Sequence, residues 1–407
     1  MRHEATAAWL LAFALAAAPP IAAADAVTDW DTIACDIVGG SKVPTPLAVR
    51  TIAITQTAVY EAVNRITRRF PGAAGDQPPG ASVEAAIAAA NRAALSALVP
   101  DQIPAIEAAY VKAVDAVADG DAKSAGIAIG ERAATEILAK RAEDGSAASE
   151  SYRPATAAGV YVPTTVPVAS QWPQRKPWLL ANVAQFRPGP PPALDSAVWA
   201  RDFNEVKALG ARNGSSRTAE QTEIARFWEA TKPSIYHGVV RAVADRPGRE
   251  ITRNARLLAA VAQGMDDALL AVFDAKYHYN FWRPITAIRN GDKDGNEGTA
   301  RDSAWLPFIE TPMHPEYPCA HCILAATVGT VIGADAGADP LPELSTTSYL
   351  LEGVTRRWTS TADFIQEVSN GRIYDGVHYR NSTEVGAAMG RKVGTLAAGA
   401  FFGAQGK

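Results

Sequence analysis

Apolar residues recur at helical spacing along most of this 407-residue chain. Thr45 can cap a helix that has Pro46 at its first position, and Thr218 with Gln221 has the form of a capping box. Val160 to Val168 is the one stretch in which we expect a short strand. The pattern otherwise predicts an all-α helical bundle. The other expected helices cover residues 82–98, 103–117, 122–142, 251–279, 323–332 and 384–402.

Residues 143–215 break this pattern, because proline, tryptophan and glycine are frequent and helical spacing is lost. We expect a long irregular arm over the helical body, with one short helix near residues 195–209. Long segments without secondary structure inside compact proteins are often lids or binding loops. A surface arm packed by its own tryptophans is the alternative, and the sequence leaves both open.

The first 24 residues have the pattern of a secretory signal peptide. Arg2 supplies a basic start, residues 8–18 form an apolar run, and Ala22 to Ala24 offer a small-residue cleavage site. The apolar run is too short for a comfortable membrane span, and no later segment has about eighteen uninterrupted apolar residues. We therefore expect a mature chain without a transmembrane span, located in the periplasm or secreted.

Composition narrows the class of partner. The chain is 48% hydrophobic, which allows a sizeable core, and its net charge of −4 argues against binding to nucleic acid. We expect a small-molecule substrate. The oligomeric state stays unknown at this level.

Three cysteines allow two interpretations. Cys319 and Cys322 are close enough in sequence to pair, which would leave Cys35 as an odd thiol. Alternatively, all three are free. Export permits disulfides, and we therefore favour a bond between Cys319 and Cys322.

Three segments in the last third of the chain concentrate cations and histidines. Lys276 and Arg283 lie in KYHYNFWRP, and Arg372 and His378 lie in RIYDGVHYRNS. Three cations can neutralise a tetrahedral oxyanion such as phosphate or vanadate, while histidines attack it, ligate it or move a proton. Pro284 disfavours helical geometry at Arg283, so we expect the chain to turn there.

The segment between them, HPEYPCAHC, leads into a helix. Pro318 to His321 precede the apolar run that begins at Ile323. A helix N-terminus presents unpaired backbone N–H groups that suit an anion, so His321 would lie beside a bound anion. In the third segment, Gly376 allows a close approach of backbone or ligand.

Together these segments resemble the three-part signature of the vanadium haloperoxidase and type 2 phosphatidic acid phosphatase superfamily. That signature is Lys, six residues and Arg-Pro; then Pro-Ser-Gly-His; then Ser-Arg, five residues, His, three residues and Asp. The phrases FWRP and GVHYR resemble the haloperoxidase branch in particular. The matching residues here are Lys276, Arg283, Pro284, Pro318, His321, Arg372 and His378.

The resemblance implies a role for each of these residues. Lys276, Arg283 and Arg372 would hold the equatorial oxygens of the oxyanion. His378 would be the metal ligand, binding vanadium axially, in a haloperoxidase, and the phosphorylated nucleophile in a phosphatase. His321 would be the acid–base residue in either enzyme.

Three more residues enter the candidate site through the resemblance. Cys319 and Ala320 stand where the signature has Ser and Gly, and we assign both to cofactor binding. The thiol is a weaker donor than a hydroxyl, whereas the backbone N–H of Ala320 is retained. His314 falls where bromide-oxidising members tend to carry a histidine, so we include it among the catalytic residues.

The third part of the signature is incomplete. Gly371 replaces its serine and Ser382 replaces its aspartate, so the usual carboxylate partner of His378 is missing. Asp375 and Glu384 are the substitutes that we consider.

Two metal-site alternatives fail on spacing. Zinc deaminases carry His-x-Glu and then Pro-Cys-x-x-Cys, and residues 314–322 contain both pieces. The pieces nearly abut, whereas the deaminase fold needs a strand between them. A calcium loop near Asp292 has Glu297 and Ser303 where Gly and Glu are needed.

We therefore predict three parts. They are a signal peptide at 1–24, an N-terminal helical region at 25–250 that contains the arm at 143–215, and an oxyanion-binding catalytic region at 251–407.

The predicted function is a vanadate-dependent haloperoxidase that oxidises halide with hydrogen peroxide. The first alternative is an acid phosphatase that needs no cofactor and acts through a phosphohistidine. The second is an oxyanion-binding protein without turnover, which the replacements at Cys319 and Ser382 favour.

Overall fold

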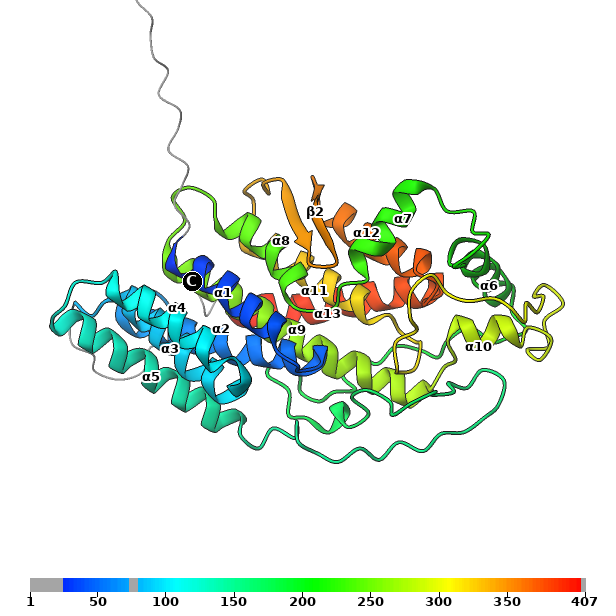
Figure 1. Ribbon diagram of the computed structural model, residues 1–407, viewed down its shortest axis with the longest axis horizontal. Helices are drawn as coiled ribbons and strands as arrows, with labels where there is room; N and C mark the ends of the chain where they lie inside the picture. Colours follow the sequence, from blue (N-terminus) through cyan, green and yellow to red (C-terminus); the bar gives the residue numbers. More distant parts are fainter. Residues whose placement is uncertain (1–24, 73–79, 404–407) are drawn as a thin grey trace, which may run out of the picture.

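The computed structural model describes residues 25–72 and 80–403, and within them the predicted all-α fold is confirmed. The predicted signal peptide lies outside the described residues. Helices α3 to α5 occupy one end of the molecule, α6, α7 and α10 occupy the other, and α9 runs between them (Figure 1). The predicted division at residue 250 stays a prediction, although a helix begins there. None of the helices in the described part has the length and apolar character that a membrane span requires.

The described elements are, in chain order, α1 (Ala26–Gly40), α2 (Thr45–Thr67), α3 (Val83–Leu98), η1 (Pro100–Gln102), α4 (Ile103–Asp115), α5 (Asp121–Arg141), η2 (Trp172–Gln174), α6 (Ala197–Leu209), α7 (Ala219–Trp228), α8 (Ser234–Ala244), α9 (Ile251–Tyr279), α10 (Pro284–Arg289), α11 (Ala320–Ala336), β1 (Leu344–Ser348), β2 (Leu351–Trp358), α12 (Thr361–Tyr374) and α13 (Arg380–Phe402).

Local sequence signals locate several of these helices correctly. The capping box at Thr218 and Gln221 is present, and Ser82 caps α3 by accepting from the Ala85 N–H. At α2 the expectation is wrong by one residue, because Pro44 holds the cap position and makes no side-chain hydrogen bond. Helices α11 and α13 begin three and four residues earlier than their apolar runs suggest.

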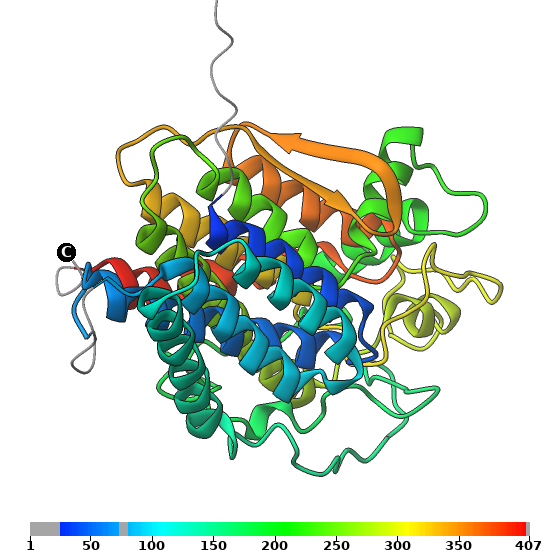
Figure 2. The same cartoon turned by 60° about the vertical axis from the view of Figure 1, so that its left-hand side comes forward.

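The strand prediction at 160–168 is wrong, apart from a single bridge between Val160 and Phe281. The strands of the described residues are instead β1 and β2, which form an antiparallel hairpin. Its strand β2 alternates irregularly, and only Trp358 among its residues is buried. The alternation of hydrophobic and polar residues along the hairpin is therefore weak. The hairpin packs against α8 beside the helical body (Figure 2).

Helix α9 forms the axis of the core. Its residues from Asn254 to Lys276 are all buried, which is expected of a helix covered on every side. Helices α2, α11 and α13 pack around it. Lys276 is in the last turn of α9, which ends at Tyr279. Its side chain therefore lies in the interior of the protein.

Helices α11 and α13 lie close together because glycines line the facing side of α13. Gly386, Gly390 and Gly394 recur at every fourth position and so share one face. An added Cβ would lie 2.6 Å from the Cys319 carbonyl oxygen at Gly386, and 2.3 Å from the Ile323 carbonyl oxygen at Gly390. This close approach fixes the start of α11 against the start of α13.

The Pro/Trp-rich arm is fastened to α9 by buried carboxylates. Arg175 donates to Asp266 at 2.7 Å and to Asp144 at 2.8 Å, with all three side chains fully buried. Asp267 accepts from the backbone N–H groups of residues 178–180. These bonds favour the interpretation as a packed surface arm over that of a mobile lid, and the expected short helix is present as α6.

Gly390→Ala should lower the free energy of unfolding by about 1–3 kcal/mol, because its Cβ overpacks the contact with α11. Gly399→Ala is the matched control on the same helix, since nothing lies within 4 Å of its added Cβ. We expect that control to be neutral or stabilising by up to about 1 kcal/mol. Urea unfolding followed by circular dichroism measures both, and equal midpoints would contradict the close packing.

Arg175→Leu should destabilise the fold by about 3–5 kcal/mol, because it leaves the Asp266 carboxylate buried without its cation. Arg212→Leu is the control, since Arg212 pairs with Glu310 on the surface. An exposed pair contributes at most about 1 kcal/mol. Thermal unfolding of both variants compares them, and a small effect at Arg175 would show that the arm is held by apolar packing alone.

Candidate active site

The candidate residues meet where four helices end or begin. Lys276 is in the last turn of α9, Arg283 precedes α10, and Arg372 is in the last turn of α12. His378 lies in the loop between α12 and α13, and His321 is in the first turn of α11. Each of these five side chains is buried. The structure therefore brings together residues that are up to about a hundred positions apart in the chain.

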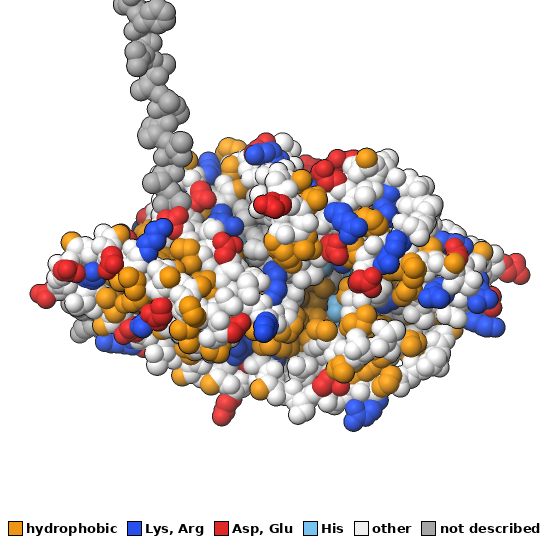
Figure 3. Space-filling model, viewed as in Figure 1, with side chains coloured by type: hydrophobic (Ala, Val, Ile, Leu, Met, Phe, Trp, Pro, Cys, Tyr) orange, Lys and Arg blue, Asp and Glu red, His pale blue; other side chains and the backbone are white. Residues whose placement is uncertain are grey.

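A cavity of about 480 Å³ ends at this cluster. Figure 3 shows a hollow near the centre of the molecule in which histidine is visible among hydrophobic side chains. The residues of the candidate site that line this cavity are His314, Ala320, His321, Arg372 and His378.

Arg283 lies behind the cavity and organises its floor. Its Nε donates to the His314 carbonyl oxygen at 2.9 Å, and its Nη1 donates to the Val377 carbonyl oxygen at 2.8 Å. Nη1 is also 3.4 Å from Nε2 of His378. Pro284 places Arg283 in an extended conformation before α10, as the sequence predicts. The guanidinium thus joins the His314 and His378 loops.

Lys276 and Arg372 complete the set of cations. The Lys276 ammonium donates to the carbonyl oxygens of Pro315 at 3.0 Å and Glu316 at 2.7 Å. Arg372 donates to the Trp228 carbonyl oxygen at 2.7 Å and forms a buried ion pair with Asp375. These hydrogen bonds and this ion pair therefore fix the orientation of both cationic side chains.

His378 is held by a glutamate. Glu316 accepts from His378 Nδ1 at 2.7 Å and from the Tyr379 backbone N–H at 3.1 Å. A histidine that donates from Nδ1 carries its lone pair on Nε2, the nitrogen needed by a metal ligand or a nucleophile. Glu316 therefore fixes the tautomer of His378.

The two carboxylates proposed from the sequence are the wrong partners of His378. Asp375 is engaged by Arg372, and Glu384 is exposed on α13. Ser382, which replaces the aspartate of the signature, lies 3.4 Å from His378 Nδ1. The signal for Glu316 was its place as the one acidic residue of HPEYPCAHC, a segment otherwise without negative charge.

His321 has the properties of a proton acceptor. Its Nε2 lies 3.1 Å from the Ala230 carbonyl oxygen and donates to it, so the neutral ring carries its lone pair on Nδ1. Burial and the neighbouring Arg372 hold the pKa of His321 well below its usual value. The ring is therefore neutral and able to accept a proton beside the cavity.

Cys319 and Cys322 form a disulfide, which confirms the favoured interpretation and leaves Cys35 as a buried free thiol. Cys319 caps α11, with its sulfur accepting from the Cys322 N–H at 3.1 Å. The disulfide faces α13, because both cysteines lie beside Gly386. The oxyanion-binding role predicted for Cys319 therefore falls on a disulfide sulfur outside the cavity lining, whereas Ala320 lines it.

His314 supports Arg283. Its Nδ1 lies 2.9 Å from Nη2 of the guanidinium, and its ring packs edge-on against Phe273 with centroids 5.3 Å apart. Burial, with Lys276 and Arg283 nearby, holds the pKa of His314 well below its usual value. A neutral His314 is an acceptor for Arg283, and the catalytic role predicted for it stays a prediction.

The site contains more buried positive charge than negative charge. Burial, with added repulsion from Arg283, holds the pKa of Lys276 well below its usual value. Burial likewise lowers the pKa of Arg283 to about 10 and raises that of Glu316 to about 7. Three cations face two carboxylates, Glu316 and Asp375. An anion in this place would relieve the repulsion, so the electrostatics suit an oxyanion.

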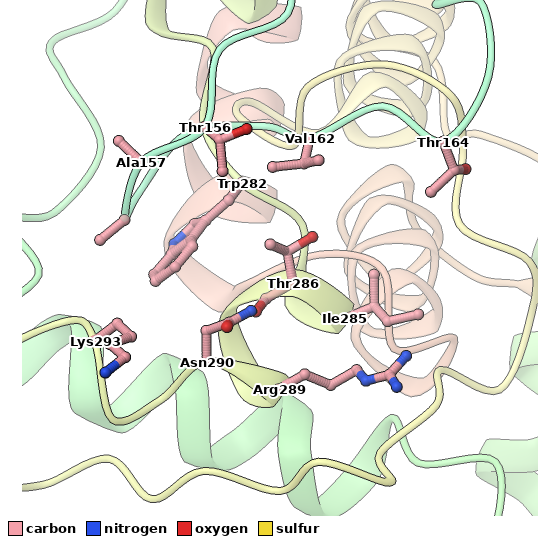
Figure 4. Close-up of a pocket in the computed structure, with 11 residues that line it drawn as sticks. Thr156, Ala157, Val162, Thr164, Trp282, Ile285, Thr286, Arg289, Asn290 and Lys293 are labelled. Atoms are coloured by element: carbon pink, nitrogen blue, oxygen red, sulfur yellow. The ribbon is translucent and has the colours of Figure 1, made fainter.

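Two other candidate sites among the described residues lack this combination of cations and histidines. A second hollow of about 530 Å³ is lined by Trp282, Arg289 and Lys293 among others, and its lining contains no histidine (Figure 4). Asp31, Cys35 and His237 could form a metal site by proximity. The Asp31 oxygens, however, already accept hydrogen bonds from the side chains of Gln56, His237 and Arg241.

The structure gives a physical reason against both the zinc site and the calcium site, which the sequence excludes on spacing. The cysteines of the zinc motif are joined in the disulfide and so are not thiolates. In the loop that resembles a calcium site, Asp294 accepts from Trp199 and Thr299 side chains. The Asp294 carboxylate is therefore already engaged by hydrogen bonds from side chains of the protein.

Comparison with known proteins agrees with this geometry. Residues 256–402 match the family described as the VCPO second helical-bundle domain. A curated relative, the vanadium chloroperoxidase of Curvularia inaequalis, is 26% identical over 176 residues. That match covers 35% of this chain and 28% of the relative's length, so the chain spans less than a third of that protein.

Solved structures extend the likeness to nearly the whole chain. A bacterial vanadium-dependent iodoperoxidase is 23% identical with a TM-score of 0.78, over 91% of this chain and 95% of its own. An apo bacterial vanadium-dependent chloroperoxidase is 16% identical with a TM-score of 0.70, over 89% of this chain and 96% of its own. The chain therefore has the helical fold of the bacterial vanadium haloperoxidases, and its residues 256–402 match the VCPO second helical-bundle domain.

Proposed function

We propose that this protein is a vanadate-dependent haloperoxidase-type enzyme that oxidises halide with hydrogen peroxide. The observation that carries the proposal is the pair of His378 and Glu316 beside three buried cations, Lys276, Arg283 and Arg372. Glu316 fixes Nδ1 of His378 as a donor and leaves the lone pair on Nε2, which lies 3.4 Å from Nη1 of Arg283. An imidazole nitrogen that carries a lone pair among cations suits the ligation of an anionic metal oxide.

The donor set fits vanadate. Lys276, Arg283 and Arg372 would neutralise its oxygens, Ala320 at the start of α11 would add a backbone N–H, and His378 Nε2 would ligate the metal. No described residue accepts the Ala320 N–H as a hydrogen bond. Vanadate bound there would act as a Lewis acid on hydrogen peroxide without changing its oxidation state.

The residues of the chain supply the rest of the chemistry. The neutral His321 accepts a proton at Nδ1 from a reactant in the cavity and returns it to the leaving oxygen. Arg372, which forms a buried ion pair with Asp375, would stabilise negative charge at the cavity floor. The buried position of these groups strengthens each interaction, since water does not screen them.

An acid phosphatase is the second candidate, and the same observation favours it. Nε2 of His378, which carries the lone pair, is also the nitrogen that would attack phosphate, with His321 protonating the leaving alcohol. No described lining residue distinguishes phosphate from vanadate, because both are tetrahedral oxyanions. An oxyanion-binding protein without turnover would use the same cations.

We further propose a periplasmic or secreted location and a small-molecule substrate. The location rests on the N-terminal pattern and on the disulfide, which persists in oxidising compartments. The substrate class rests on the size of the cavity, about 480 Å³, which suits a small molecule. Mass spectrometry of the native protein tests the location, and a mature chain that still begins at Met1 would contradict export.

One experiment separates the three functions. The purified protein is assayed for bromide and iodide oxidation with vanadate and peroxide, and for aryl phosphate hydrolysis without vanadate. Halide oxidation that requires vanadate supports the proposal. Hydrolysis alone supports the phosphatase, and tight vanadate binding without either reaction supports the binding protein.

His378→Ala should abolish halide oxidation or hydrolysis, because it removes the metal ligand or the nucleophile. His321→Ala should reduce turnover while retaining vanadate affinity, because its role is proton transfer. Calorimetry measures vanadate binding, and circular dichroism checks that both variants fold. If His378→Ala binds vanadate as tightly as the parent protein, the two roles are assigned wrongly.

Glu316→Gln should lower vanadate affinity or turnover by about 10–100-fold, as is typical when the partner of a metal-ligating histidine is removed. Glu384→Gln is the matched control, since its carboxylate is exposed and it should change neither quantity. The pH profile of turnover is measured as well, because the loss of a residue with a purely structural role would leave that profile unchanged. An unchanged affinity and profile in Glu316→Gln would refute the positioning role.

A further inference from the structure

A pocket lined by arginines lies at the opposite end of α9 from the active site. Its volume is about 600 Å³, and it forms where the segment after α2, the loop between α8 and α9, and the last turns of α11 and α13 meet. Arg253 and Lys276 are 23 positions apart on α9, which corresponds to about 35 Å along the helix. The pocket is therefore separate from the active site. We call it the arginine pocket, after Arg69, Arg246, Arg249, Arg253 and Arg256 in its lining.

Positive charge exceeds negative charge in the arginine pocket. Three lining residues carry a carboxylate, namely Glu250, Asp335 and Asp339, against five that carry a guanidinium. Glu250 is the N-cap of α9, and its carboxylate accepts from the backbone N–H groups of Thr252 and Arg253. One of the three carboxylates is thus already engaged by the backbone. The excess of cations suits an anionic ligand.

Arg249 contributes a buried donor that lacks an acceptor. Its Nε donates to Asn254 Oδ1 at 2.7 Å and its Nη1 to Asp335 Oδ2 at 2.9 Å, while Arg253 donates to the other oxygen of Asp335 at 3.3 Å. The Arg249 side chain is only 8% exposed, and no described residue accepts a hydrogen bond from its Nη2. A buried donor without an acceptor costs free energy, and an anion in the pocket would supply the acceptor. This donor points to an anionic ligand independently of the net charge.

Two more arginines are restrained before any ligand binds. Arg256 lies over the ring of Phe70, with its Cζ 3.9 Å from the ring centroid. Arg246 donates to the Pro340 carbonyl oxygen at 3.3 Å, which orients its guanidinium without neutralising it. Restrained side chains lose less freedom when a ligand binds. The arginine pocket is therefore largely prepared for its ligand.

We propose that the arginine pocket binds a phosphate-bearing ligand with at least two negative charges. Guanidinium groups donate in pairs to phosphate oxygens, and a tetrahedral group can accept from several arginines at once. The volume lies within the range of about 300–1,000 Å³ that is usual for small-molecule sites, so a condensed or organic phosphate suits it better than a lone phosphate ion. Lipid headgroups offer the same chemistry, but the net charge of −4 opposes approach to an anionic membrane and favours a free molecule. This proposal does not rest on the proposed function.

Methylenediphosphonate is the probe, because it carries two phosphate-like groups joined by a bridge that a phosphatase does not cleave. Calorimetric titration into the purified protein, without vanadate, should show saturable binding. Arg246→Glu should weaken that binding at least tenfold, because it replaces a donor with a carboxylate. Arg357→Glu is the matched control, since it makes the same change in net charge at an exposed side chain of β2 that pairs with Glu343. The control should change the affinity less than twofold.

Folding and the active site are controlled separately. Circular dichroism checks each variant, and Arg69→Glu, at an exposed side chain of the same pocket, repeats the test in case Arg246→Glu does not fold. The cations of the active site offer a second place for the probe, which would bind there equally in all variants. Identical titrations of the parent, Arg246→Glu, Arg69→Glu and Arg357→Glu would therefore overturn the proposal. Vanadate-dependent iodide oxidation should be the same in all four proteins, so its absence would refute the haloperoxidase function and leave the arginine pocket untouched.

Vesicles distinguish the two sources of phosphate. Phosphatidylcholine vesicles with and without phosphatidylglycerol are sedimented with the parent protein and with the same variants. Binding of methylenediphosphonate alone, lost in Arg246→Glu and kept in Arg357→Glu, supports a pocket for a free phosphate compound. Sedimentation with phosphatidylglycerol that has the same dependence supports a pocket for a lipid headgroup. Absence of both kinds of Arg246-dependent binding would overturn the proposal.

Discussion

Burial of three cations at one point is the constraint on which the rest of the structure depends. Lys276, Arg283 and Arg372 are almost fully inaccessible to water, and together they exceed the local negative charge. A buried charge is tolerated only when hydrogen bonds and partners compensate it. Main-chain carbonyl oxygens of the loops at 314–316 and 377 supply much of that compensation. The same loops carry the histidines, so compensating the cations also positions the site.

The carboxylate that accepts from Nδ1 of His378 comes from a different part of the chain than the family signature suggests. Ser382 is one helical turn from His378 and lacks a carboxylate. Glu316 approaches the same nitrogen from the loop before α11 and also accepts from the Tyr379 N–H. Because Lys276 binds the backbone of Glu316, the carboxylate, the cation and the histidine form one connected unit.

Close helix packing keeps this unit in place. The glycines of α13 let α11 approach until backbone nearly meets backbone, and the disulfide lies at the start of that contact. On the opposite side the arm is held by buried aspartates of α9 and supplies Val168 to the cavity wall. The site is thus built on rigid elements, and its cavity exists without a ligand.

The sequence by itself determined the helical class, the three cations, the two principal histidines and the cysteine pair. Those features depend on the spacing of residues within single segments. Periodicity, proline and capping residues affect only their own neighbourhood in the chain, so the sequence is enough to recognise them. The partner of His378, the hairpin β1–β2 and the apolar cavity were decided by tertiary structure. Glu316 lies 62 positions from His378, and the cavity walls come from the arm, two helices and a loop. Such contacts depend on which helices pack together, and packing is set by the whole core rather than by any one segment.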